Sequence, residues 1–191
     1  MHPISFRAVL FPAVEDGSFL RAPDAAACDH GGPGPSLQAM SDLYHNRILE
    51  LAANIPHLGT LEGAEASVLK VSRVCGSTVN VEIILDEAGD HIAAIAVDPK
   101  ACALGQAATA ILSEYAVGAS VDEVIAARDA MKTMLKENGP PPEGRFWELR
   151  HLQAVADYPP RHTSTLLAFE AAVAAIEQAR VARGLAPATV S

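Results

Sequence analysis

The sequence has few cysteines and no concentration of positive charge. Its three cysteines are an odd number at scattered spacing among 191 residues, so they do not form the disulfide framework of a small secreted protein. Reduced thiols and a cytoplasmic location are the simpler expectation. Lys and Arg number 14 against 23 Asp and Glu, for a formal charge of −9, and they form no cluster. This composition argues against nucleic acid or an anionic membrane as the main partner.

Long hydrophobic runs are also missing from the chain. None reaches the ~20 residues that a membrane-spanning helix needs, although half of all residues are hydrophobic. The sequence therefore has the material for a packed core but contains no membrane span.

Three segments are expected along the chain. Residues 1–39 lack sustained periodicity, contain the stretch APDAAACDHGGPGPS and do not resemble a secretory signal, so they are predicted to be a disordered extension or to precede the true start. Residues 40–183 are expected to form one folded domain, and residues 184–191 a flexible C-terminal tail. Cys28 and His30 fall within the extension and are therefore weak candidates for a metal site.

Three strands are predicted after a first helix. The helix begins near Met40, with Ser41 or Asp42 as its N-cap. The strands are expected over residues 66–73, 78–85 and 91–97, and the second alternates cleanly between apolar and polar residues. Because the connections between them are too short for crossovers, the sheet should be an antiparallel meander.

Helices are predicted to follow the sheet. One begins at Asp98-Pro99, a second opens with a capping box from Ser120 to Glu123, and a third runs from Thr163 to Arg183. Residues 145–160 form a short segment of uncertain type. The sequence predicts an α+β fold, a small three-stranded antiparallel sheet with helices packed on one face, one helix before the sheet and several after it.

Two cysteines and one histidine lie at the ends of predicted elements. Cys75 precedes the second strand, and Gly76 beside it allows the backbone to approach a metal closely. Cys102 lies in the first turn of a helix, where free amides favour a thiolate, and His162 precedes the last helix. Thiolates with an imidazole suit zinc or iron, so Cys75, Cys102 and His162 are the predicted metal site. The alternative is that both cysteines are small core residues.

The order of these features resembles the NifU/IscU/SufU family of iron–sulfur cluster assembly scaffolds over roughly residues 40–182. The family has a Cys-Gly-Asp motif, a second cysteine at the start of the following helix, and a third after a His or Lys that opens the final helix. Cys75-Gly76 matches the first, and Cys102 in VDPKACALGQ matches the second. His162 in RHTSTLLAFEAAVAAI matches the residue before the third. The long stretch before His162 is similar to the insertion of the SufU branch.

Two positions depart from the family pattern. Ser77 stands in place of the aspartate, and Thr163 in place of the third cysteine. A [2Fe–2S] cluster usually has four protein ligands, mostly thiolates, so a further ligand is needed. Asp98 is close to Cys102 in sequence and could supply it, but helix N-caps are the favoured interpretation of both Asp98 and Thr163.

The resemblance implies a protein that accepts sulfur from a cysteine desulfurase and iron from a donor. It would hold a labile cluster, with [2Fe–2S] expected, or iron, and pass the cluster to apo-proteins. Zinc also suits the ligand set. No turnover of a small substrate is implied, so an enzymatic activity is not expected, and the oligomeric state stays open. The alternative is a degenerate member that binds one metal ion and serves as a sulfur-transfer partner or regulator without building clusters; the loss of the third cysteine favours it.

Overall fold

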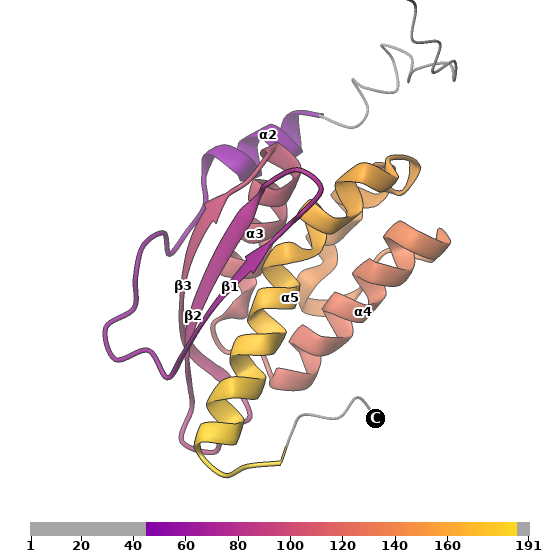
Figure 1. The fold of residues 1–191 in the computed structure, drawn as a ribbon. Coiled ribbons are helices and arrows are strands. Elements are labelled where there is room, and N and C mark those ends of the chain that lie inside the picture. The colour runs from indigo at the N-terminus through magenta and orange to yellow at the C-terminus, as the bar shows by residue number, and fades with distance from the viewer. Residues whose placement is uncertain (1–44, 187–191) are drawn as a thin grey trace, which may run out of the picture. The chain divides into compact units, whose positions relative to one another are not determined.

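The computed structural model describes residues 45–186, all of which belong to one compact unit of the chain (Figure 1). The elements follow in the order α2 (Asn46–Ala53), β1 (Ala66–Val71), β2 (Thr78–Leu85), β3 (Ile92–Lys100), α3 (Ala103–Ala116), α4 (Val121–Glu137), the 3₁₀ segment η1 (Gly144–Asp157) and α5 (Pro159–Ala182). No helix in this part of the chain is long and apolar enough to cross a membrane.

The sheet is the predicted antiparallel meander, in the order β1-β2-β3. Its register aligns Val71, Thr78 and Lys100 in one row across the three strands. Inward-facing residues of β2 are buried in strict alternation, as the sequence pattern requires. The row at Thr78 marks the end of the sheet from which the β1–β2 loop emerges.

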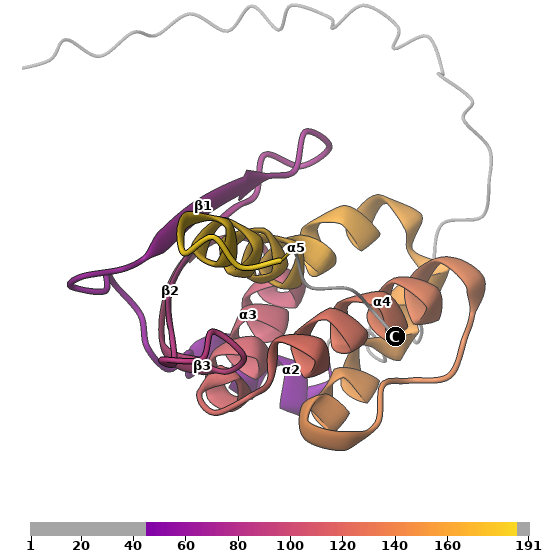
Figure 2. The ribbon, with the colours of Figure 1, turned by 90° about the horizontal axis from the view of Figure 1, so that it is seen from below.

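All the helices lie on one side of this sheet (Figure 2). Helix α5 packs on β1 and β2, while α3 packs on β3. Helix α4 packs on α5 and on η1, η1 packs also on α3, and α2 packs on α3, which makes a second helical layer. The prediction of an α+β fold with helices on one face is therefore confirmed.

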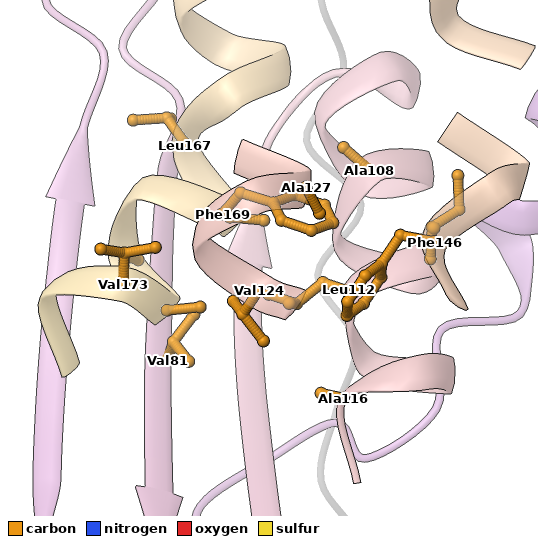
Figure 3. Packing of buried hydrophobic residues seen from close by; sticks show 14 of the residues in the cluster. Val81, Ala108, Leu112, Ala116, Val124, Ala127, Phe146, Leu167, Phe169 and Val173 are labelled. Carbon is orange, nitrogen blue, oxygen red and sulfur yellow. The ribbon is translucent and has the colours of Figure 1, made fainter. Parts of the chain in front are cut away.

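The core fills the space between the sheet and the helices. Val81 of β2 and Val173 of α5 face it from one side, and Leu112, Phe146 and Phe169 meet deeper inside (Figure 3). The rings of Phe146 and Phe169 pack edge to face, with centroids 5.4 Å apart. Each such side chain contributes about 1.5–3 kcal/mol on burial, so this contact holds η1 firmly against α5.

The boundary between β3 and α3 differs from the prediction. Asp98 is not a helix N-cap: it pairs with Asn80 inside the sheet, and β3 continues to Lys100. Helix α3 begins at Ala103, and Cys102 itself is the N-cap. Strand pairing with β2 prevails here over the local Asp-Pro signal, because Pro99 occupies an edge strand that tolerates a missing N–H.

The start of the last helix also differs from the prediction. Helix α5 begins at Pro159, with Pro159 and Pro160 in its first turn, where proline is favoured. Thr163 is therefore not an N-cap; it lies inside the helix and is exposed. The capping box from Ser120 to Glu123, in contrast, is present as predicted.

The ends of the domain are only partly described. The proposed extension, residues 1–39, and the predicted caps Ser41 and Asp42 lie outside the described residues; α2 itself has His45 as its N-cap. Residues 184–186, predicted to be part of a flexible tail, make defined contacts: the Leu185 N–H donates to the Arg180 carbonyl over 2.9 Å. Arg183 donates to Glu65 and to the carbonyl of Asp86, which ties the end of α5 to the sheet.

Candidate metal and sulfur site

The connection between β1 and β2 is a closed loop that presents Cys75. The Ser72 N–H donates to the Ser77 carbonyl over 2.8 Å, and the Gly76 N–H donates to the Ser72 carbonyl over 2.8 Å. Gly76 has a φ of 72°, a left-handed conformation that favours glycine. The glycine thus serves the turn itself, and the loop between β1 and β2 lies at the end of the sheet where α5 begins (Figure 1).

Hydroxyl groups surround the sulfur of Cys75. Its Sγ lies 3.3 Å from Ser72 Oγ and 3.1 Å from Ser77 Oγ. Both serines are buried, whereas Cys75 is exposed. The pKa of Cys75 is lowered to about 7. The largest cause is the hydrogen bond from the Ser72 hydroxyl, followed by those from the Ser77 hydroxyl and N–H, with a smaller one from Ser164. These bonds stabilise the thiolate and outweigh the opposing effect of burial. A large share of this thiol is therefore ionised at neutral pH.

Cys102 approaches the same place from the start of α3. It is partly buried, and its backbone carbonyl accepts a hydrogen bond from the Gln106 N–H. Its Sγ lies 3.8 Å from the hydroxyl of Ser164. Ser164 also makes the weakest of the hydrogen bonds that lower the pKa of Cys75. The two cysteines, 27 positions apart in the sequence, thus both lie near one serine of α5.

Ser164 is the residue that the sequence analysis missed. It is fully buried on α5, and its hydroxyl donates to the Arg161 carbonyl over 3.0 Å while lying beside both thiols. Its neighbour Thr163, the residue singled out from the family pattern, faces solvent instead. The helical spacing of buried residues in α5 could have identified Ser164. It lies one turn before Ala168, on the face of the helix that packs against the core.

His162 does not join the two cysteines. Its Nε2 lies 3.0 Å and 3.1 Å from the carbonyl oxygens of Val155 and Ala156 at the end of η1. Because both partners are acceptors, Nε2 carries the hydrogen and Nδ1 keeps its lone pair. Among residues 45–186 no three His, Cys, Asp or Glu side chains form a group that could hold a metal ion, so the expected convergence of all three ligands is not met.

Asp98, the other candidate ligand, interacts with a lysine side chain. Its carboxylate is half exposed and lies 3.5 Å from Lys100 Nζ. Cys28 and His30 lie outside the described residues. The site therefore contains two thiols and three serine hydroxyls, an environment in which thiolates can bind a soft metal or accept sulfur.

Comparison with known proteins identifies the family. Residues 43–178 match the family model described as the NifU-like N terminal domain. The chain belongs to this family. The match covers the sheet and all but the end of α5, so it includes every residue of the site.

Two relatives of this NifU-like chain carry the comparison further. A crystal structure of a nitrogen-fixing NifU-like protein (N-terminal) from Brucella abortus is 44% identical, with a TM-score of 0.72, over 75% of this chain and 98% of that one. The iron–sulfur cluster assembly scaffold protein IscU of Streptococcus pyogenes is 27% identical over 78% of this chain and 92% of its own length. The resemblance predicted from the sequence is confirmed.

A third similarity concerns the fold alone. The putative scaffold protein of the SUF system from Fervidobacterium islandicum is 21% identical, with a TM-score of 0.65, over 71% of this chain and 98% of that one. The helix-covered three-stranded sheet is thus an architecture that the NifU-like chain shares with distant relatives.

Proposed function

We propose that this NifU-like protein is an iron–sulfur cluster assembly scaffold. It accepts sulfur from a cysteine desulfurase and iron from a donor, holds a labile cluster, and passes the cluster to apo-proteins. The observation that carries the proposal is that thiols from two separate elements, Cys75 and Cys102, flank the buried hydroxyl of Ser164. The name of the Streptococcus pyogenes relative supports the same function.

Cys75 and Cys102 are the proposed thiolate ligands. For the third protein position the geometry supports Ser164 over His162, because Ser164 Oγ lies beside both thiols while His162 Nε2 is bonded to two carbonyls. His162 could contribute only through Nδ1. A serine oxygen is a weaker partner than a thiolate for iron, so a [2Fe–2S] cluster here would be labile, as delivery to another protein requires.

Two further aspects belong to the proposal. Sulfur acceptance by a reduced thiol fits a cytoplasmic protein. The chain binds and delivers its cargo without converting a small substrate, so it is not proposed to be an enzyme.

A second candidate is favoured by the count of thiols. With two cysteines in its described part, the protein could hold a single zinc or iron ion and act as a sulfur-transfer partner or regulator without assembling clusters.

Anaerobic reconstitution with ferrous iron and sulfide separates the two candidates. The scaffold should develop a visible charge-transfer absorption that is lost in both Cys75→Ser and Cys102→Ser. A colourless protein that retains one equivalent of zinc would support the single-metal candidate instead. Ser67→Ala, which alters an exposed hydroxyl bonded to Glu82, is a matched control that should behave like the wild type.

A further inference from the structure

We propose that Cys75 and Cys102 act as an acceptor thiol and a resolving thiol. Cys75 takes up sulfane sulfur as a persulfide, and Cys102 then attacks that persulfide, which releases sulfide and leaves a Cys75–Cys102 disulfide. The inference rests on the proposed sulfur-accepting function and adds the step by which the chain itself reduces the sulfur it receives.

The difference in exposure assigns the two roles. Cys75 is exposed at the tip of the β1–β2 loop, next to Val74, whose side chain is 66% exposed. A persulfide carried by another protein or by a small thiol can therefore reach it directly. Cys102 is partly buried at the start of α3 and packs against the core, so it is poorly placed to meet a donor but well placed to meet Cys75.

The loop geometry allows the second step. Ser164 Oγ lies 3.8 Å from Cys102 Sγ, and the same hydroxyl is near enough to Cys75 to stabilise its thiolate weakly. Cys102 is fixed by its place at the helix start, whereas Cys75 belongs to a loop closed by two backbone hydrogen bonds. Apart from its chain neighbours, no described residue lies within 4 Å of the point where a Cβ of Gly76 would stand. No packed side chain in this part of the chain therefore confines the loop at the residue after Cys75, and a disulfide would need the Cα atoms of Cys75 and Cys102 about 4.4–6.8 Å apart.

The atoms and electrons balance with a persulfide, R–S–SH, as the oxidant. The Cys75 thiolate attacks the outer sulfur of the donor, which breaks the donor S–S bond and releases R–S⁻. The Cys102 thiolate then attacks Cys75 Sγ, the bond from that atom to the outer sulfur breaks, and HS⁻ leaves. In sum, R–SSH and two cysteine thiols give R–SH, one disulfide and H₂S. The two electrons come from the cysteines, and glutathione returns the disulfide to the dithiol.

The test uses the full-length chain, reduced and free of metal, with Cys28→Ser in every sample to remove the remaining cysteine. One equivalent of glutathione persulfide is added without oxygen, and intact mass and free sulfide are followed. The double variant Cys75→Ser/Cys102→Ser supplies the background. The chain with both cysteines should lose two hydrogen atoms in mass and release one equivalent of sulfide. Cys102→Ser should stop at one added sulfur on Cys75, and Cys75→Ser should do neither.

Two results would overturn the inference. One is a persistent added sulfur without sulfide in the chain that has both cysteines; the other is sulfide release by Cys75→Ser. Peptide mapping of the disulfide in that chain needs neither single variant, so a folding defect in one of them leaves the test intact. Cluster reconstitution on the same samples keeps the two claims apart: a cluster without sulfide release contradicts only this inference, and sulfide release without a cluster contradicts only the scaffold.

Discussion

At the scale of single residues, the site depends on serine hydroxyls around one exposed sulfur. Ser72 is the largest cause of the lowered pKa of Cys75, followed by Ser77. Ser77 is also the residue that departs from the aspartate of the family motif. A hydroxyl stabilises a neighbouring thiolate by donating to it, whereas a carboxylate would repel it. The departure therefore favours an ionised, reactive Cys75.

This environment predicts the pH profile of alkylation at Cys75. The thiolate is the reacting form, so the rate with iodoacetamide should fall as the pH drops below about 7, the pKa of Cys75. In Ser72→Ala the midpoint should move upward, toward the usual value of about 8.5. Peptide mapping assigns the rate to Cys75.

Ser67→Ala is the control for this measurement, because its hydroxyl bonds to Asn80 and Glu82. Its midpoint should equal that of the wild type. A wild-type midpoint at the value of an ordinary thiol, or no change in Ser72→Ala, would show that the hydroxyls do not stabilise the thiolate.

The sequence revealed the two cysteines but not the serine between them. Cys75 and Cys102 could be chosen because each stands at an element boundary beside a recognisable motif. Ser164 could not, because its role depends on where α5 begins. The sequence pattern places the helix start at Thr163 instead of Pro159, which makes Thr163 a cap and His162 a residue before the helix and gives the buried Ser164 no role.

At the scale of elements, the site depends on how closely α3 approaches α5. Gly105 lies at this contact: a Cβ there would come within 2.8 Å of Ala101 Cβ and 2.9 Å of the Ser164 carbonyl oxygen. Backbone cannot yield to such a contact as a flexible side chain would. The absence of a side chain at Gly105 thus allows Cys102 and Ser164 to meet.

Gly105→Ala should therefore disturb the site by forcing α3 and α5 apart. We expect a loss of about 1–3 kcal/mol in the free energy of unfolding from the steric conflict, together with weaker retention of iron or zinc. Urea unfolding and metal analysis of the purified protein measure the two effects.

Glu114→Gly is the matched control, since Glu114 is exposed on the same helix and a glycine there weakens that helix by about 0.5–1 kcal/mol without touching the contact at Gly105. It should lose stability and keep its metal. Equal metal loss in both variants would mean that stability alone, and not the approach of the two helices, sets retention.

Some helices and strands could be predicted from their local sequence alone. The alternation in β2 and the capping box of α4 were predicted from a few residues because nothing else competes for them. The junction from β3 to α3 was not, since hydrogen bonds to β2 extend the strand past Asp98. Pairing between strands is a tertiary effect that a local cap signal does not contain.

At the scale of the whole molecule, the helices are fastened to one another and to the sheet at several points. One is the contact between the start of α2 and η1, where His45 Nε2 lies 3.2 Å from the His151 carbonyl and Arg47 pairs with the buried Glu148. Burial, then the nearby His45, lowers the pKa of His151. Neutral His151 is therefore the form compatible with this contact.

The sign of the resulting pH dependence follows from linkage. In the unfolded chain His151 takes up a proton near its usual pKa of about 6.5, whereas in the folded protein it resists protonation. The unfolded state then binds more protons as the pH falls below about 6.5, and stability falls with it. We expect wild-type protein to lose more unfolding free energy between pH 7.5 and 5.5 than His151→Gln.

Urea unfolding at the two pH values measures this difference. The carboxylates with lowered pKa values, Asp86 and Glu123, lose their contribution only at more acidic pH, so they do not obscure it. Equal losses in the wild type and His151→Gln would show that the α2–η1 contact does not depend on the charge of this histidine.

The meeting of Cys75, Cys102 and Ser164 is tested most directly by adding a third thiolate. In Ser164→Cys the new sulfur would lie beside the other two, whereas in Thr163→Cys it would lie on the exposed face of α5. Zinc affinity, measured anaerobically by competition with a chromophoric chelator, should rise at least about tenfold in Ser164→Cys, or ~1.4 kcal/mol, and stay at the wild-type value in Thr163→Cys. A gain in Thr163→Cys with none in Ser164→Cys would contradict the site described for this protein.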